Sequence, residues 1–126
     1  MAALIFDTGA LIGLDRGDRA IAALLATAAK SGIEAVTSSA CVAQAWRNPA
    51  RQVKLARGLA GFLEHPIDAT AARRNGSLLA NTGTRDVVDA AVVLLAQDGD
   101  TILTSDPQDI ERLLNATGTR ATIRTV

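Results

Sequence analysis

The stretch Ala2-Ala3-Leu4-Ile5-Phe6-Asp7 decides the fold of this chain. Five apolar residues without polar alternation are typical of a strand that is buried on both faces of a parallel sheet. Asp7 ends this strand, so its carboxylate is expected at the carboxyl edge of the sheet. In parallel α/β sheets that edge gathers the strand ends and the starts of the adjoining helices.

The rest of the chain repeats this change from strand to helix. Strands are predicted at 2–6, 33–37, 101–104 and 122–126, with a weaker one at 66–67, and helical segments fill the intervals between them. Asp18, Ser39 and Asp68 are expected to cap helices. The sequence therefore predicts one α/β domain over 1–126, a three-layer α/β/α sandwich whose mainly parallel central sheet has about five short strands.

Composition narrows the function only slightly. The formal net charge is zero, so no overall basic field indicates a nucleic-acid partner, although a local basic face would suffice. Cys41 is the single cysteine and is expected to be a small buried hydrophobe. No leader pattern is present, and no apolar run approaches the ~20 residues that span a bilayer. We expect a cytoplasmic protein without membrane contact.

Four aspartates lie where strands change to helices. Asp7 and Asp106 follow apolar runs, and Asp86 and Asp89 open a helix with the i, i+3 spacing that places them on one face. Each is also a good helix cap, and Asp86 is a ligand or merely a cap. Carboxylates that converge repel one another unless a proton or a hard cation offsets their charge. The pattern predicts a divalent-metal site, with Asp89 the better ligand of its pair.

Other chemistries fit the sequence poorly. Zinc prefers histidine and cysteine, whereas carboxylate-rich sites suit Mg²⁺ or Mn²⁺. His65 is the only histidine and is expected in a surface turn, so a two-histidine ribonuclease mechanism cannot form within one chain. The triplet Asp7-Thr8-Gly9 matches the aspartic-protease signature, but those enzymes are all-β. A phosphoacceptor receiver would need a strand-end lysine, and both Lys30 and Lys54 fall on predicted helices.

Three stretches in order resemble the PIN-domain nucleases, and among them the VapC toxins of toxin–antitoxin pairs: 4–11, 89–93 and 102–107. The resemblance spans nearly the whole chain. It implies that Asp7, Asp89 and Asp106 bind Mg²⁺ or Mn²⁺ and that the protein is an endoribonuclease. It also implies a homodimer and inhibition by a small cognate VapB-type antitoxin.

The chain departs from the family at Gln44, where its members usually have a glutamate in the helix after the second strand. An amide oxygen can coordinate a metal or hold a water, but it brings no charge, and Asp86 could restore that charge. Two functions follow. One is a ribonuclease toxin with Asp7, Asp86, Asp89 and Asp106 in catalysis; the other is a weak or inactive PIN-like module that binds RNA or a partner.

Residues that could hold the acids or a metal-bound water in place are predicted beside them. Metal ions would neutralise the phosphodiester and lower the pKa of a bound water. Thr104 and Ser105 could hydrogen-bond an aspartate or such a water, or only satisfy the end of the strand.

The basic residues Arg47, Arg51 and Lys54 fall at i, i+4 and i+7, and Arg57 extends this stripe, although Pro49 breaks the strict helical period and makes the alignment approximate. They form an RNA-binding face or a solvated helix face, and Arg85 is a further phosphate contact. Trp46 is assigned to the core, to a dimer interface or to base stacking.

Overall fold

A computed structural model describes residues 2–126, and within this range the predicted order of strands and helices is confirmed. The strands are β1 (Leu4–Phe6), β2 (Ala35–Ser38), β3 (Leu63–His65), β4 (Thr101–Thr104) and β5 (Thr122–Thr125). The helices are α1 (Thr8–Asp15), α2 (Arg19–Lys30), α3 (Ser39–Ala45), α4 (Val53–Leu59), α5 (Ala69–Thr82), α6 (Val87–Leu95) and α7 (Pro107–Thr117). A 3-10 turn, η1 (Pro49–Arg51), precedes α4.

The described strands form one parallel five-stranded sheet in the order β3-β2-β1-β4-β5. β1 is central, and Phe6 stands in register with Thr37 on one side and Leu103 on the other. The chain fills one half of the sheet with β2 and β3, then returns to the other half with β4 and β5. The strand order therefore reverses between β1 and β4. In open α/β sheets, ligands bind beyond the carboxyl ends of the strands at such a reversal.

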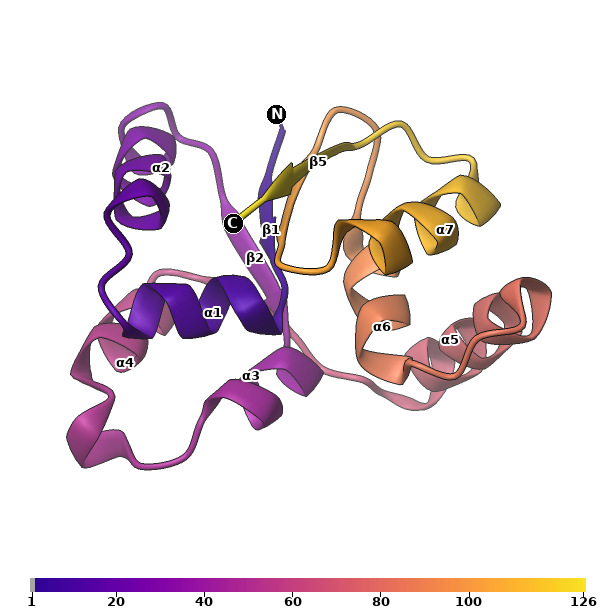
Figure 1. Cartoon of the computed structure of the whole chain (residues 1–126), viewed down its shortest axis with the longest axis horizontal. Helices are drawn as coiled ribbons and strands as arrows, with labels where there is room; N and C mark the ends of the chain where they lie inside the picture. The colour runs from indigo at the N-terminus through magenta and orange to yellow at the C-terminus, as the bar shows by residue number, and fades with distance from the viewer. Residues whose placement is uncertain (1) are drawn as a thin grey trace.

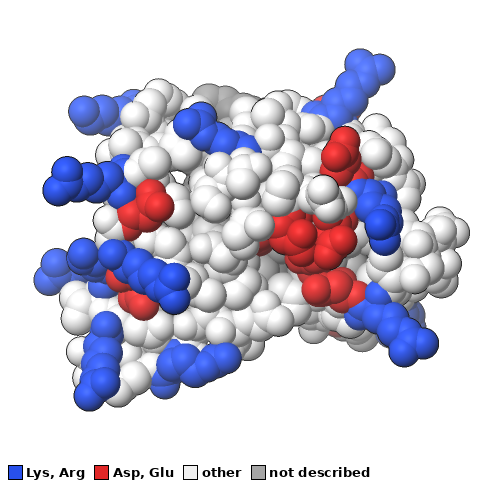
Figure 2. Space-filling view, viewed as in Figure 1, with Lys and Arg blue, Asp and Glu red and all other residues white. Residues whose placement is uncertain are grey.

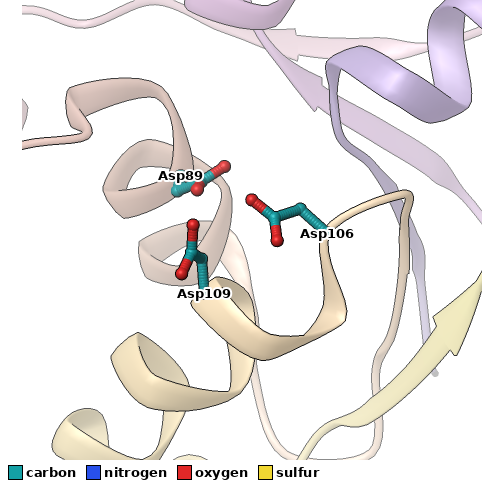
Figure 3. A group of neighbouring side chains, drawn as sticks. All are labelled: Asp89, Asp106 and Asp109. Carbon is teal, nitrogen blue, oxygen red and sulfur yellow. The ribbon is translucent and has the colours of Figure 1, made fainter.

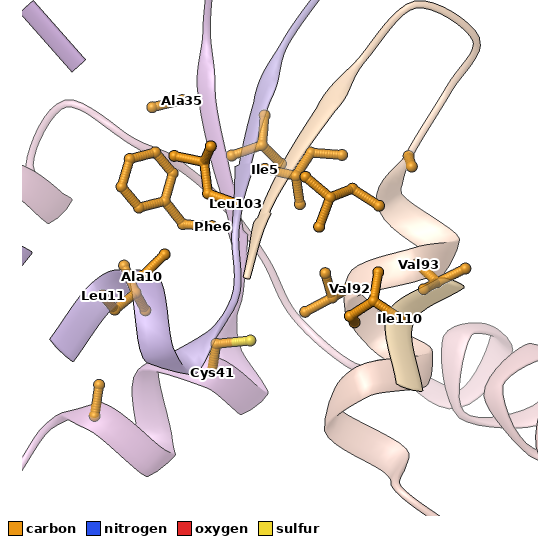
Figure 4. Packing of buried hydrophobic residues seen from close by; sticks show 14 of the residues in the cluster. Ile5, Phe6, Ala10, Leu11, Ala35, Cys41, Val92, Val93, Leu103 and Ile110 are labelled. Carbon is orange, nitrogen blue, oxygen red and sulfur yellow. The ribbon is translucent and has the colours of Figure 1, made fainter. Parts of the chain in front are cut away.

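Helices cover both faces of this sheet, so the predicted three-layer sandwich is confirmed. Helices α1 to α4 lie on one side and α5 to α7 on the other (Figure 1). Ile5 and Phe6 are fully buried, because β1 is covered on both faces. Phe6 and Leu103 point toward the α1 side, while Val92 and Ile110 approach from α6 and α7 (Figure 4). The core is thus divided by the sheet into two apolar layers.

The single cysteine lies where the sequence predicts. Cys41 is fully buried in α3, as expected of a small hydrophobe, and burial above all raises its pKa to about 11. It therefore stays a thiol at neutral pH. Within residues 2–126, no helix is long and apolar enough to cross a membrane.

The third strand differs from its prediction. β3 pairs with β2 over Leu63–His65 rather than at 66–67, so His65 ends a strand and is half-buried instead of occupying a surface turn. Pro66 has no backbone N–H for the ladder, which explains why the strand stops before it. The cap of α3 is also shifted: the Ser38 hydroxyl, not that of Ser39, accepts a hydrogen bond, from Ala40 N–H at 3.1 Å.

Candidate metal centre

Asp7 is both a helix cap and a buried acid at the sheet edge. Its backbone N–H donates to Leu103 O (3.1 Å), which extends the β1–β4 ladder by one residue. Its carboxylate accepts from Ala10 N–H (2.8 Å) and so caps α1. The side chain is only 5% exposed, and this burial raises its pKa, while hydrogen bonds from Thr104 and backbone N–H groups oppose the rise. The roles of cap and candidate ligand are therefore compatible in one geometry.

The sequence leaves open whether Asp86 and Asp89 are metal ligands or helix caps, and the structure gives them different roles. Asp86 accepts from Asp89 N–H (2.9 Å) and is the N-cap of α6. Asp89 Oδ2 is buried and has no hydrogen-bond partner among the described residues. Burial raises the pKa of Asp89 to about 7, helped by the negative charges of Asp86, Asp106, Asp7 and Asp109 in that order. Asp89 is the electrostatically strained acid of the pair.

Asp106 and Asp109 repeat this pattern at the start of α7. Asp106 occupies the N-cap position, but its carboxylate makes no capping hydrogen bond within the described chain. Desolvation and the adjacent Asp109 carboxyl raise the pKa of Asp106. Asp109 lies in the first helical turn and is exposed. The Asp106 carboxylate is therefore free to face α6.

Three of these carboxylates converge. Oxygen atoms of Asp89, Asp106 and Asp109 all lie within 4.8 Å of one another, and the side chains point toward a common space between α6 and α7 (Figure 3). Acidic side chains form a patch over these elements in the space-filling view (Figure 2). Asp7, at the end of the neighbouring strand, adds its charge to the same field. We call Asp89, Asp106 and Asp109 the aspartate cluster.

Asp109 is the member of the cluster that was not predicted. A sequence signal for it exists, because Asp106-Pro107-Gln108-Asp109 repeats the i, i+3 spacing of Asp86-Val87-Val88-Asp89. That spacing places two acids on one face of a helical turn. In the first pair the second aspartate is the better ligand, and the same interpretation of the second pair would have included Asp109.

The donors in this cluster fit a hard divalent cation. Leaving a carboxylate oxygen buried and unpaired costs free energy, as at Asp89, and like charges within 4.8 Å add to that cost. A cation bound by carboxylate oxygens would offset both. Oxygen ligands are those that Mg²⁺ and Mn²⁺ prefer.

Thr104 links the two strand-end acids. It is fully buried, its Oγ1 accepts from Asp106 N–H (2.9 Å), and its hydroxyl lowers the pKa of the Asp7 carboxyl against the effect of burial. Ser105 is exposed and packs against Gly9, where a Cβ would come within 2.7 Å of the Ser105 Cβ. Gly9 is thus required by the close approach of the β4–α7 turn.

Gln44 is engaged by a neighbour of Asp7. The Thr8 hydroxyl donates to Gln44 Oε1 at 2.6 Å, and the amide is exposed at the surface of α3. A neutral amide oxygen can accept a hydrogen bond from a hydroxyl without any charge to balance. The contact with Thr8 therefore accounts for the position of the Gln44 side chain without a metal. Gln44 is not part of the aspartate cluster.

The predicted basic stripe is wrong as a helical pattern. Arg47, Arg51 and Lys54 lie on three segments: the turn after α3, the 3-10 turn η1, and α4. All three are exposed, and Arg47 Nη1 donates to Trp46 O (2.7 Å). The i, i+4, i+7 spacing therefore does not place these three side chains on one helix face. Figure 2 shows Lys and Arg side chains along the α1–α4 side of the molecule, and others flanking the acidic patch.

Gln52 causes the break between α3 and α4. Its buried amide accepts from Arg47 N–H (2.7 Å) and Asn48 N–H (3.0 Å) and donates to Ala45 O (2.8 Å). The bend leaves an apolar groove of about 580 Å³ between α3 and α4, and Trp46 lines it. Trp46 also packs on the core, so it lies at the boundary of core and surface.

Arg85, the remaining predicted phosphate contact, belongs to a different part of the chain from Arg47, Arg51 and Lys54. It is exposed and directly precedes the Asp86 cap at the start of α6. This basic side chain is therefore close in sequence to the acids, whereas Arg47 and Arg51 belong to the α3–α4 region.

No protein-family model matches the chain, and no curated protein matches it. The fold, with five parallel strands in the order 3-2-1-4-5 among the described residues, is PIN-like. The solved structures include a similar one, the crystal structure of VapBC2 from Rickettsia felis bound to a DNA fragment from their promoter. The two chains share 14% identity and a TM-score of 0.69 over 98% of each. This likeness confirms the predicted fold.

Proposed function

We propose that this protein is a divalent-metal-dependent endoribonuclease that acts as the toxin of a VapBC-type pair in the cytoplasm. The observation that carries the proposal is the buried Asp89 Oδ2, which has no hydrogen-bond partner within residues 2–126 and lies in a cluster of carboxylates at the strand-order reversal of a PIN-like sheet. Mg²⁺ or Mn²⁺, when bound, neutralises a phosphodiester and lowers the pKa of a bound water. Asp89 and Asp106 hold the ion, and Asp7 completes the predicted set.

The residues around the cluster support this assignment. Thr104 fixes the backbone of Asp106 through its hydroxyl and lowers the pKa of Asp7, so one buried side chain acts on both acids that follow the adjacent strands β1 and β4. Asp86 contributes charge and caps α6. We assign RNA phosphate contacts to the exposed Arg47, Arg51 and Arg85, whose positive charge offsets the repulsion between an acidic patch and a polyanion.

Cleavage of structured RNA by the purified protein tests the proposal. With Mn²⁺ or Mg²⁺ present, the wild-type chain should cut some of these RNAs, whereas EDTA should abolish cleavage. Asp89→Asn and Asp7→Ala should each reduce the rate at least ~100-fold, a loss typical of removing a group that stabilises the transition state. Asp68→Asn is the matched control, because Asp68 is an exposed cap on α5 and asparagine caps equally well. Cleavage without metal, or full activity of Asp89→Asn, would reject the proposal.

The second candidate function is a non-catalytic PIN-like module that binds RNA or a protein. Gln44 favours it, because its amide brings no charge to the acidic set and is already bonded to Thr8. Such a module would bind RNA with equal affinity in wild type and Asp89→Asn, and neither would cleave it. Gel-shift and cleavage assays on the same RNAs therefore separate the two functions.

The similar solved structure, a VapBC assembly, supports the proposal of an antitoxin partner, while the homodimer rests on the resemblance to the VapC toxins. We propose a small VapB-type antitoxin and a homodimer for this chain. Light scattering after size-exclusion chromatography should give twice the chain mass for the protein alone. Co-expression with a candidate VapB-type antitoxin should give a larger complex without nuclease activity. A monomer whose activity that protein leaves unchanged would contradict both partners.

A further inference from the structure

The proposed metal centre lacks an acid at the expected place. The resemblance implies a glutamate where this chain has Gln44, yet the neutral amide of Gln44 accepts the Thr8 hydroxyl at 2.6 Å. If the centre binds a cation as tightly as a four-acid set would, another carboxylate must supply the charge. The described residues offer two candidates near Asp89, namely Asp86 and Asp109.

Asp86 already has a structural role. One of its oxygens accepts Asp89 N–H at 2.9 Å, which fixes the carboxylate over the first turn of α6. No Asp86 oxygen belongs to the group of oxygens that lie within 4.8 Å of one another. The charge of Asp86 helps to raise the pKa of Asp89, but its carboxylate is placed to cap α6. The sequence-based idea that Asp86 compensates for Gln44 therefore has no support from the geometry.

Asp109 has the position that Asp86 lacks. Its carboxylate oxygen lies within 4.8 Å of those of Asp89 and Asp106, and the side chain points from α7 toward both (Figure 3). The start of a helix favours an acid by a fraction of a kcal/mol wherever its carboxylate points. That interaction does not account for a third carboxylate directed at two others, one of which has a buried oxygen without a partner in the described chain.

We infer that Asp109, supplied by α7, is a direct metal ligand and replaces the acid that α3 lacks at Gln44. The inference rests on the metal dependence proposed above and names one residue of that site. The aspartate cluster then contains the ligands from α6 and α7, and α3 contributes none. The ligands that α6 and α7 supply then come from two helix starts with the same i, i+3 spacing of acids, and they join Asp7 of the proposed set.

Calorimetric titration of Mn²⁺ into the metal-free protein at pH 8 tests the inference without reference to cleavage. Asp109→Asn and Asp86→Asn are matched, since each removes one negative charge near Asp89 and leaves an isosteric amide. An asparagine in place of Asp86 would still cap α6. Loss of a ligand should weaken Mn²⁺ binding by Asp109→Asn at least ~30-fold, whereas Asp86→Asn should lose less than about fivefold. Gln44→Ala and Glu111→Gln, the latter an exposed acid on α7, should stay within about twofold of wild type.

Each outcome bears either on Asp109 alone or on the metal centre as a whole. Equal losses in Asp109→Asn and Asp86→Asn would show a general charge effect and overturn the inference, as would a large loss in Gln44→Ala. If Asp89→Asn loses Mn²⁺ binding while Asp109→Asn does not, the proposed metal centre is supported and the assignment of Asp109 as a ligand is rejected. If the wild type binds no Mn²⁺, both the inference and the proposed function fail. Because Asp109 is exposed, circular dichroism should show an unchanged fold in its variant.

Discussion

Asp89 combines two properties that rarely occur in one side chain without a ligand. One carboxylate oxygen is buried without a hydrogen-bond partner among the described residues, and four other aspartates raise the free energy of its charged form. Its neighbour Asp86 relieves none of this, because the Asp86 carboxylate is turned to the backbone of the helix start. At the residue scale, ionised Asp89 therefore destabilises the folded protein when no cation is bound.

This destabilisation should appear as a dependence of stability on pH in the metal-free protein. The pKa of Asp89 is about 7 in the folded state and 3.8 in an unfolded chain, so the folded state keeps its proton while the unfolded state loses it. Stability should thus fall as pH rises from about 4 to 7 and stay low above that. Asp89→Asn should be more stable than wild type at pH 8 by about 2 kcal/mol, roughly half of the full shift because water screens the charges.

Urea unfolding of both proteins in EDTA at about pH 4 and pH 8 checks this expectation. The difference in unfolding free energy between variant and wild type should nearly vanish at the lower pH. There Asp89 is protonated in the folded state and partly protonated in the unfolded chain as well. A variant that is less stable than wild type at the higher pH would show that the carboxylate is stabilised by contacts absent from the structure described here.

At the scale of elements, the site depends on which segments the helices and strands bring to one edge. β1 and β4 deliver Asp7 and Asp106, while the starts of α6 and α7 deliver Asp89 and Asp109. On the other face, a bend at Gln52 separates α3 from α4, and Trp46 and Arg47 lie at this bend. The two faces of the sheet thus carry separate surfaces: the aspartate cluster lies on the α5–α7 side, and the apolar groove lies on the α1–α4 side, which also carries basic side chains.

This separation predicts that Gln52 matters for stability and not for metal binding. Gln52→Ala leaves the N–H groups of Arg47 and Asn48 and the carbonyl of Ala45 without their present partner. Buried or half-buried groups that lose a hydrogen bond cost about 1 kcal/mol or more each, so the variant should lose about 2–3 kcal/mol. Urea denaturation measures this loss, and the Mn²⁺ affinity of the folded variant should match that of wild type. A markedly weaker affinity would show that the two surfaces are coupled.

At the scale of the whole molecule, a cation should act as a stabiliser of the folded state. The acids of the cluster come from the starts of α6 and α7, which meet only when these helices pack together, so an unfolded chain cannot bind an ion with the same ligands. A ligand that binds only the folded state adds about 2.7 kcal/mol of stability at a concentration about 100 times its dissociation constant.

Thermal unfolding at about pH 8 should therefore shift upward by several degrees when Mn²⁺ is added and return when EDTA is added. Asp89→Asn should show little of this shift, which makes it the internal control. Since protonation of Asp89 competes with the cation, the shift should shrink at about pH 5. An equal shift in wild type and Asp89→Asn would indicate non-specific binding to surface acids.

Local sequence patterns predict most of this fold. The buried run before Asp7, the helix caps at Asp18 and Asp68, and the apolar run before Asp106 each reflect interactions within a few residues, and the structure confirms them. The edge strand β3 lies elsewhere than predicted because its ends are set by pairing with β2, which no local pattern encodes. Likewise, the break at Gln52 depends on hydrogen bonds to segments on both sides of it.

By itself, the sequence determined the α/β order, the strand-end position of Asp7 and the acids available for a metal site, because these follow from periodicity and from the chemistry of single residues. Only the tertiary structure decided which acids meet. Asp109 joins Asp89 because α6 and α7 pack side by side over the reversal of strand order, while Gln44 turns to Thr8 and Asp86 to its own helix. Distances between side chains on different elements arise from packing of the whole chain, which no window of sequence contains.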